Sequence, residues 1–418
     1  MIRLSGQPAP RIPVAALIVI LGVAVLAVLA RIATQAILGF YRGPETWEEG
    51  YVALDLAAGR GYGHMDLGTW QVGFRAPVYP LLLGAAYAVL GSSPVVAGLF
   101  NALLGGATAA AAAVLASRLG GSLGGITAGV LVAAHPGLLV YSAKIHQLSL
   151  DALLMVAAPL IVITALDRPN IRSSLAMGMT GAALALSRAT AIPFVAFAAL
   201  IVPLRGWSVR SVQWSALVLA IVAVASAGWL ARTWIATGEP TLTTNTGLFL
   251  WIGNNPNATG TGVLADGRAV YDADPALLAR VYGKDEAEQD RIFREAALSY
   301  IAADPARAAR NVVARFGSFW WFTPTIGLSY PRSWLLAYAV YYVVLSGAAV
   351  VGSALLAYRG RGDHLATIVA LLVIVAGAQS LFYVETRHRW AVEPLLVVLA
   401  AVAVTDPALL SRLGIRRR

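Results

Sequence analysis

Runs of apolar residues recur along almost the whole chain and are separated by short polar loops. Most runs are about as long as the roughly 20 residues that a helix needs to cross a bilayer. The pattern predicts about ten spans, over residues 13–35, 97–117, 123–140, 150–166, 173–188, 189–204, 214–231, 333–357, 365–383 and 390–405. The chain is therefore predicted to be an all-α polytopic membrane protein.

Composition agrees with this interpretation. The chain is 58% hydrophobic and 12% charged, about half the charged fraction of an ordinary soluble domain. The first run, from Ile12 to about Phe40, exceeds a signal-peptide core and lacks a small-residue cleavage pattern, which predicts a retained helix. The net charge of +10 does not indicate nucleic acid, because the basic residues lie in short loops between apolar runs. The absence of cysteine excludes disulfides, thiol catalysis and Cys-ligated metals.

One apolar stretch, residues 76–91, is predicted to lie on the outer membrane surface rather than to cross. It is short and carries prolines at positions 77 and 80. If it does not cross and the N-terminus is cytoplasmic, every short inner loop carries arginine, as the positive-inside rule requires. These inner segments are "SRLGGSLGG", "DRPNIR", "RGWSVRSVQW", "YRGRGDH" and the tail "RLGIRRR".

This topology predicts three parts. Residues 1–231 form a transmembrane module with an outer loop at 41–91, residues 232–332 form an extracytoplasmic segment, and residues 333–418 supply the last spans and a cytoplasmic tail. The outer segment contains helical spacing over residues 284–303, and a new helix is predicted with Asp304 as N-cap and Pro305 in its first turn. Only three of the 21 acids fall on the inner side, namely Asp167, Asp363 and Asp406. Any chemistry is therefore expected to face outward.

Two places combine carboxylates with this outer face. Glu48 and Glu49 lie in the first outer loop, where a carboxylate could take a proton from an attacking hydroxyl. Alternatively, acids in the first turn of a helix can simply complement the helix dipole. Asp151 lies at the mouth of an apolar span, where an acid is costly and indicates function. Lys144 and His146 are close enough in sequence for an ion pair to be the alternative.

Arginines at outer span ends form a second group of candidates. The positive-inside rule makes them unexpected there, and several spans supply them to one face, which indicates a bound anion such as phosphate. Each could alternatively extend to lipid headgroups. They are Arg75, Arg188, Arg232, Arg387 and Arg389. Glu393, inside the last span, is predicted to pair with one of these cations.

The segment from Thr244 to Gly262, "TNTGLFLWIGNNPNATGTG", is dense in Gly, Asn and Pro and predicts a tightly turning loop. Its Asn257-Ala258-Thr259 also matches a glycosylation acceptor, a pattern that is common by chance. The chain has no Walker loop, dinucleotide fingerprint or HExxH motif, which argues against a soluble nucleotide or a classical zinc peptidase.

The order of these pieces resembles the GT-C fold glycosyltransferases that use polyprenyl-phosphate sugars, the group that contains protein O-mannosyltransferases and lipid A aminoarabinose transferases. The resembling segments are "WEEGYVALDLAAGRGYG", "FRAPVYPLLLGAAYAVLG", "LSLDALL", "LALSRATA", "WLARTWIATGEPTLTTNTGLFLWIGNNPNATGTG" and "ETRHRWAVEPLL". The chain departs from the family where Trp47 precedes the acid pair in place of Asp, where "RATA" has Thr for a common Pro, and where "RTW" replaces "RN".

The resemblance implies an inverting transfer of a sugar from a polyprenyl-phosphate donor to an acceptor hydroxyl on the extracytoplasmic face of the inner membrane. The acceptor would be a glycan, a lipid or a protein. Glu48 is the better match to the family acid by its spacing to Tyr51, with Glu49 as the alternative base, and Asp151 would orient a neighbouring group. The implied phosphate ligands are Arg75, Lys144, Arg188, Arg232, Arg387 and Arg389, and the implied substrate contacts are Tyr51, His146, Asn254 and Asn255.

The same reasoning implies no obligatory metal, although two carboxylates and His146 could hold one. Two alternatives stay open at this point. One is a flippase or transporter of lipid-linked sugars, since polar groups near a membrane also mark transport paths. The other is a ligase that moves a whole glycan from a diphosphate carrier.

Overall fold

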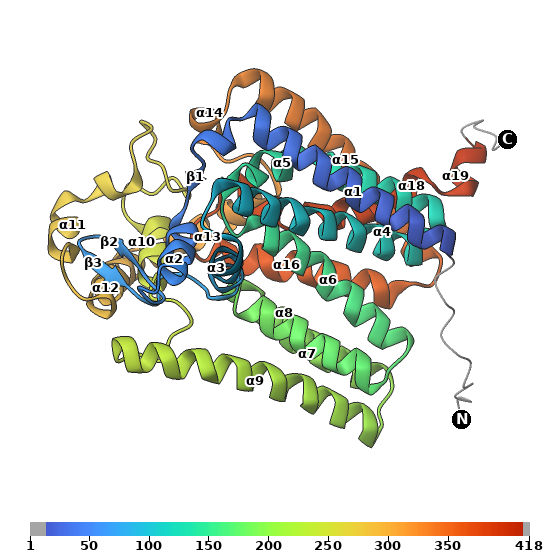
Figure 1. Cartoon of the computed structure of the whole chain (residues 1–418), viewed down its shortest axis with the longest axis horizontal. Coiled ribbons are helices and arrows are strands. Elements are labelled where there is room, and N and C mark those ends of the chain that lie inside the picture. The colour runs from blue at the N-terminus through green and yellow to red at the C-terminus, as the bar shows by residue number, and fades with distance from the viewer. Residues whose placement is uncertain (1–13, 413–418) are drawn as a thin grey trace.

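The computed structural model describes residues 14–412, so most of the arginine-rich tail and the first residues of the chain lie outside the described part. Long helices run side by side as one bundle, and a smaller body of short helices and strands covers one of its ends (Figure 1). The bundle helices are α1 (Val14–Ile37), α4 (Pro94–Ala133), α6 (Leu148–Asp167), α7 (Ile171–Ala185), α8 (Ile192–Arg205), α9 (Val209–Thr237), α15 (Arg332–Tyr358), α16 (Gly362–Ser380) and α18 (Glu393–Val404).

Each of the ten predicted spans overlaps a helix, and the span over 123–140 joins the second half of α4 to the short helix α5 (Pro136–Ser142). Within the described residues, six helices are long and apolar enough to cross a membrane, and α8 and α18 are shorter apolar helices. The 40 residues of α4 would reach roughly 60 Å, about twice a bilayer's hydrocarbon core. Gly121 resolves this, because its φ of 83° breaks the helix into the two predicted spans. The multi-pass membrane fold is confirmed.

The stretch predicted to stay outside the bilayer forms α3 (Val78–Leu90). Figure 1 views α3 almost end-on, whereas the bundle helices run across the picture, so α3 lies across the end of the bundle. The first outer loop also contains α2 (Glu48–Ala57), which packs on α3, and a hairpin of β2 (His64–Asp66) and β3 (Thr69–Gln71). A two-residue strand β1 (Glu45–Thr46) pairs in parallel with β4 (Lys144–Ile145).

The second outer segment folds over the same end with its own hydrophobic core, which includes Phe74, Trp251 and Phe293. Its helices are α10 (Thr246–Asn254), α11 (Pro275–Val281), α12 (Glu286–Ala303) and α13 (Pro305–Trp320). The predicted start of α13 is confirmed, since Asp304 accepts the Arg307 amide at 2.8 Å and Pro305 follows it. The remaining helices are short: α5 (Pro136–Ser142), α14 (Ile326–Ser329), α17 (Thr386–Trp390) and α19 (Pro407–Arg412).

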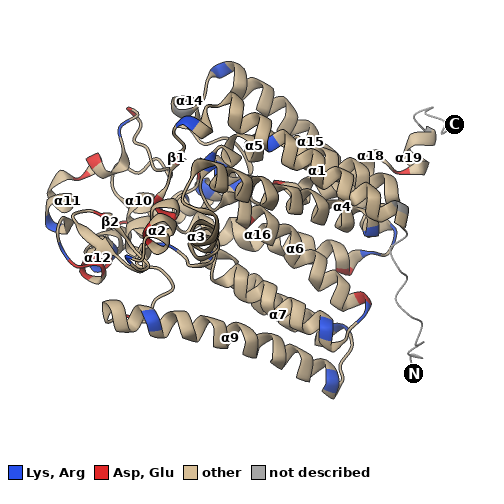
Figure 2. Cartoon of the chain, in the orientation of Figure 1, with Lys and Arg blue, Asp and Glu red and all other residues tan. Residues whose placement is uncertain are grey.

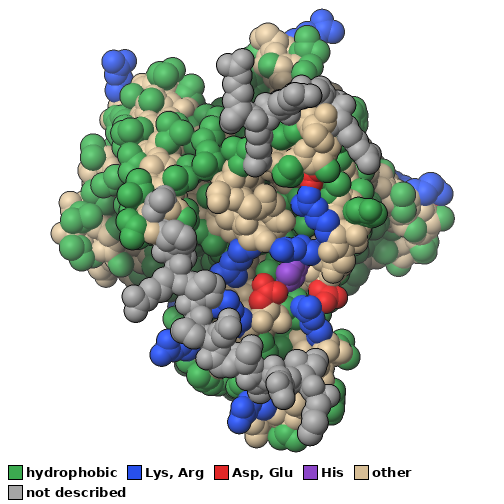
Figure 3. Space-filling model, turned by 90° about the vertical axis from the view of Figure 1, so that its right-hand side faces the viewer, with side chains coloured by type: hydrophobic (Ala, Val, Ile, Leu, Met, Phe, Trp, Pro, Cys, Tyr) green, Lys and Arg blue, Asp and Glu red, His purple; other side chains and the backbone are tan. Residues whose placement is uncertain are grey.

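Charges divide between the two ends of the bundle (Figure 2). At the end away from the small body, the three acids that were predicted to be cytoplasmic have basic partners. Asp167 contacts His364 at 2.8 Å, Asp363 contacts Arg205 at 3.0 Å, and Asp406 contacts Arg359. Figure 3 looks onto this end and shows basic and acidic side chains between hydrophobic surfaces. The small body and the first loop occupy the other end, where the candidate site residues gather.

Candidate active site

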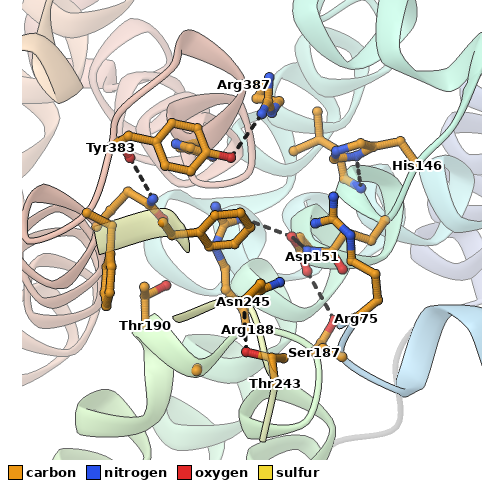
Figure 4. A pocket seen from close by; sticks show the side chains of 18 of the residues that line it. Arg75, His146, Asp151, Ser187, Arg188, Thr190, Thr243, Asn245, Tyr383 and Arg387 are labelled. Atoms are coloured by element: carbon orange, nitrogen blue, oxygen red, sulfur yellow. Dashed lines mark hydrogen bonds and ion pairs between the residues drawn. The ribbon is translucent and has the colours of Figure 1, made fainter. Parts of the chain in front are cut away.

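A cavity of about 150 Å³ lies where α6 begins, beneath the first loop and the small body (Figure 4). Three arginines from separate segments line it, namely Arg75 before α3, Arg188 between α7 and α8, and Arg387 on α17. Asp151 is the one carboxylate among its described lining residues. We call this space the arginine cavity. Its lining carries an excess of positive groups, as a site for an anion requires.

Asp151 holds Arg188 in place. It lies in the first turn of α6 and is 1% exposed, and its Oδ2 contacts Arg188 Nη1 at 2.9 Å. Ser187 donates a hydrogen bond to the other oxygen at 3.1 Å. Within residues 14–412, the Arg188 guanidinium makes no other hydrogen bond. The remaining donors of its planar fork are therefore available to a ligand.

Arg75 lies between the two glutamates of the first loop. Its Nη2 donates to Glu48 Oε2 at 2.6 Å, and its Nη1 lies 3.5 Å from Glu49 Oε1. Both acids begin α2, whose close seating depends on Gly50, because a side chain there would meet Ile145 at 2.6 Å. Arg75 therefore connects the first-loop acids with the arginine cavity.

The two glutamates differ in environment. The Glu48 side chain is 31% exposed, and although burial opposes its ionisation, the charge of Arg75 prevails and places its pKa below the ordinary value. Glu49 is fully buried, and neither of its oxygens has a hydrogen-bond partner within the described chain. Burial raises the pKa of Glu49 against the opposing effect of Arg75, and the charge of Glu48 raises it further. Glu48 is thus the accessible member of the pair and the one with the lowered pKa.

Glu48 faces a second cavity, of about 350 Å³, which lies within the first loop between the start of α2 and β2. Tyr51 lines it, as do Trp47, His64 and Asp66. His64 is 3% exposed, and burial lowers its pKa to about 4. We call this space the Glu48 cavity. A hydroxyl group that entered it would meet a carboxylate able to accept its proton.

Arg387 and two neutral histidines complete the wall of the arginine cavity. Arg387 pairs with Glu385, and its guanidinium lies over the Trp47 ring, 4.7 Å from the centroid. His146 Nδ1 accepts the Leu148 amide at 3.0 Å, and His388 Nδ1 accepts the Glu385 amide at 3.1 Å. Burial and then the charge of Arg387 hold both histidine pKa values well below the ordinary range. Each neutral ring therefore carries its proton on Nε2 and can donate from there.

Two of the arginines predicted as phosphate ligands lie away from the arginine cavity. Arg232 donates to the Val72 carbonyl at 2.6 Å and to the Tyr62 carbonyl at 3.1 Å, so it fastens the first loop to α9. Arg389 is 0% exposed, and its Nε contacts Glu393 at 2.8 Å. That contact confirms the predicted pairing of Glu393 with one of these arginines. Both arginines donate hydrogen bonds to other groups of the protein.

The other predicted contacts are also placed by the structure. Lys144 contacts Glu45 at 2.7 Å and lines a neighbouring cavity rather than the arginine cavity. The Asn254 and Asn255 side chains donate to carbonyls of α10, at 2.8 Å and 3.1 Å, and brace the turn that follows this helix. They support the small body and do not line either cavity described so far.

Several lining residues were not predicted from the sequence. They are Ser187, Thr190, Thr243, Asn245, Gln379, Tyr383 and His388. Ser187 and His388 had a signal, since each adjoins a predicted arginine in sequence. Gln379 lies near the end of α16, and the others come from connections between helices, whose sequence carries no periodicity that indicates this. Among the described residues, no group of three or more His, Asp or Glu side chains could hold a metal ion.

Comparison with known proteins places this geometry in context. Residues 75–229 match the family model described as dolichyl-phosphate-mannose-protein mannosyltransferase. A search of curated protein sequences finds no match. The archaeal oligosaccharyltransferase AglB from Archaeoglobus fulgidus, solved in complex with an inhibitory peptide and a dolichol-phosphate, aligns with 14% identity and a TM-score of 0.55. The alignment covers 97% of this chain and 52% of that one.

Two further solved structures align with the chain. The apo form of the Archaeoglobus fulgidus oligosaccharyltransferase aligns over 96% of this chain and 52% of its own, with 13% identity and a TM-score of 0.53. ArnT from Cupriavidus metallidurans bound to undecaprenyl phosphate aligns over 94% and 80%, with 16% identity and a TM-score of 0.41. The chain thus spans about half the length of the oligosaccharyltransferase. The predicted GT-C architecture is confirmed, and the predicted family resemblance is confirmed over residues 75–229.

Proposed function

We propose that this protein is an integral-membrane glycosyltransferase that moves a sugar from a polyprenyl-phosphate donor to an acceptor hydroxyl, with inversion at the sugar carbon. The observation that carries the proposal is Arg75, which lines the arginine cavity and donates to Glu48 at 2.6 Å. Arg75 thereby joins two sites: a cationic cavity for a leaving phosphate and an accessible carboxylate for an incoming hydroxyl. The dolichol-phosphate bound to the aligned archaeal oligosaccharyltransferase supports a lipid phosphate as the ligand.

The leaving group explains the arginines. As the glycosidic bond breaks, negative charge grows on the phosphate oxygens, and fixed donors in a cleft of low dielectric stabilise that charge. Arg75, Arg188 and Arg387 are assigned to this role, with Asp151 and Ser187 fixing the direction of Arg188. The Nε2–H groups of His146 and His388 would add uncharged donors. The apolar polyprenyl chain would lie along the membrane-spanning helices.

Glu48 is assigned as the general base. The acceptor hydroxyl loses its proton to Glu48 as its oxygen bonds to the sugar carbon, and the phosphate leaves with the bonding electrons. Protonation removes the negative charge that Arg75 contacts at 2.6 Å. Arg75 then has no ionised partner at Glu48, and its charge becomes available to the departing phosphate. Base action and leaving-group stabilisation would therefore reinforce one another.

The side of the membrane is part of the proposal. The arginine-containing short loops lie at the opposite end of the bundle from both cavities (Figure 2), and arginine-rich short loops face the cytoplasm in bacterial inner-membrane proteins. The reaction would consequently occur on the extracytoplasmic face. An acceptor there is a glycan, a lipid or an exported protein.

The test uses the purified full-length protein in sealed lipid vesicles, radiolabelled polyprenyl-phosphate sugars and a membrane extract as the source of acceptor. Transfer is expected for the wild type, and Arg188→Gln should lower its rate about 10²–10³-fold. Arg291→Gln is the matched control, because Arg291 is exposed on α12 and pairs with Glu288 and Glu295 away from the cavities. Movement of the labelled lipid across the bilayer with no glycosidic bond formed would refute the proposal and favour a flippase.

A further inference from the structure

A third cavity lies beside the arginine cavity and shares Trp47 and Arg387 with it. Its volume is about 260 Å³. Threonines line it from three segments: Thr261 after α10, Thr323 and Thr325 before α14, and Thr386 at the start of α17. We call this space the threonine cavity. Because Trp47 also lines the Glu48 cavity, three cavities meet at one indole ring.

The threonine hydroxyls are arranged for a hydroxylated ligand. Thr261 and Thr325 hydrogen-bond to each other at 2.8 Å. Across residues 14–412, the hydroxyls of Thr323 and Thr386 have no hydrogen-bond partner, and neither is among the polar atoms that protein encloses completely. A hydroxyl both donates and accepts, so these two groups can each exchange hydrogen bonds with a sugar hydroxyl.

The charges around the threonine cavity are balanced. Lys144 Nζ contacts Glu45 at 2.7 Å, and Arg387 pairs with Glu385. Each cation that lines the threonine cavity is thus paired with a carboxylate, and of these two carboxylates Glu385 is itself a lining residue. A uronic acid or an amino sugar would have to break one of these pairs or lose water without gaining a partner, and both are costly. The cavity therefore favours an uncharged ligand.

One wall offers a rigid aromatic surface. Tyr330 lines the threonine cavity and stacks on Trp334, with ring centroids 4.6 Å apart and the ring planes inclined by 22°. The stacking covers one face of Tyr330 and fixes the ring. A ligand that is otherwise polar can place its C–H face against this ring. Because the ring is already fixed, the contact costs little side-chain entropy.

We propose that the threonine cavity is the subsite for the transferred sugar and that this sugar is a single uncharged polyhydroxylated ring. The inference rests on the proposed function. A volume of about 260 Å³ is below the roughly 300–1,000 Å³ of sites for drug-sized ligands, so it suits one ring rather than an oligosaccharide. The sugar carbon that reacts would lie at Trp47, between Glu48 and the phosphate held by Arg75.

The experiment compares four ligands on the full-length protein in nanodiscs: polyprenyl phosphate without a sugar, and the same lipid carrying a neutral hexose, a uronic acid or an amino sugar. Thr323→Val removes one hydroxyl at almost unchanged volume. Losing one hydrogen bond should weaken binding of the hexose-bearing lipid about 2- to 12-fold and leave binding of the bare lipid phosphate unchanged. Thr323→Ser, which keeps the hydroxyl, should restore the affinity. Thr237→Val is the control, because the Thr237 hydroxyl bonds within α9 at 2.8 Å, outside all three cavities.

Three results would overturn the inference. The first is an equal loss of affinity for the bare lipid and the hexose-bearing lipid in Thr323→Val. The second is a loss that appears only in the KM for the acceptor, which would make the cavity an acceptor site. The third is tighter binding of lipids that carry a uronic acid or an amino sugar than of the neutral hexose. Failure of the wild type to bind bare polyprenyl phosphate is a separate result, and it would refute the proposed function itself.

Discussion

The first-loop acids allow a sharp test, because Glu48→Gln and Glu49→Gln make the same chemical change at adjacent positions. Glu48 is 31% exposed beside a cavity of about 350 Å³, whereas Glu49 is 0% exposed. An acceptor hydroxyl can reach the first carboxylate and not the second. Glu48→Gln is therefore expected to lower the rate of transfer strongly and Glu49→Gln to change it little, although the two substitutions are isosteric.

The magnitude follows from the role of each residue. Removing a general base costs about 10²–10⁴ in rate, or about 3–5 kcal/mol at 1.36 kcal/mol for each factor of ten. Glu48→Gln should lower kcat/KM for the acceptor by that amount. Glu49 is closed to an acceptor hydroxyl, and burial and the charge of Glu48 raise its pKa against the effect of Arg75, so its substitution removes no group that the acceptor touches. Glu49→Gln should therefore change kcat/KM by less than about tenfold.

The assay measures initial rates of sugar transfer in nanodiscs, with donor binding and thermal unfolding recorded for each variant. Donor binding should survive in both, since neither glutamate lines the arginine cavity. A loss in Glu49→Gln as large as that in Glu48→Gln, at unchanged unfolding temperature, would refute the assignment of the base. Undiminished transfer by Glu48→Gln would refute it as well.

Three further outcomes are expected. Arg188→Gln should lower transfer about 10²–10³-fold at unchanged stability of the outer loop. Arg232→Gln should keep the intrinsic rate of transfer but lower the free energy of unfolding by about 1–3 kcal/mol, because two carbonyls lose their donor. Denaturant titration measures this free energy. The acidic limb of kcat/KM against pH should lie below pH 4.5 in the wild type, because Arg75 outweighs burial and lowers the pKa of Glu48. Arg75→Gln removes the largest influence that lowers this pKa while burial still raises it, so the limb should move to higher pH, and an unmoved limb would contradict the role of Arg75. Transfer should persist after treatment with EDTA, and a loss that Mg²⁺ or Mn²⁺ restores would contradict the expectation of no obligatory metal.

The membrane helices and the position of α3 could be predicted from the sequence because hydropathy and charge distribution determine them directly. The apolar runs locate the spans, and the distribution of arginine among short loops separates the surface helix from them. The break at Gly121 was also predictable as the boundary between two runs. The small body was predicted in part, through the N-cap of α13 at Asp304. The fold of its loops over the bundle has no such local signal.

The candidate site was harder to predict, because it depends on which way each side chain points. Arg387 and Arg389 both appear in "ETRHRW", yet one lines the arginine cavity and the other is buried against Glu393. They are two residues apart on α17, and at 3.6 residues per turn such positions point about 200° apart. The sequence identified the pair but could not choose between its members. Arg232 shows the same limit, since its backbone acceptors come from a loop about 160 residues earlier in the chain.

The parallel pairing of β1 with β4 shows how distant segments are brought into one site. Glu45 pairs with Lys144 and Thr46 with Ile145, so the next residues on the two strands, Trp47 and His146, come together with ring centroids 4.8 Å apart. Trp47 precedes the proposed base, and His146 precedes α6 with its Asp151. A strand of only two residues therefore fixes the first loop against the membrane helix that orients Arg188. Trp47 lines all three cavities. A shift of this short strand pairing would therefore move the proposed base, the sugar subsite and the phosphate site apart from one another. The proposed chemistry thus needs ordered backbone in a loop that the sequence alone shows only as a cluster of acids.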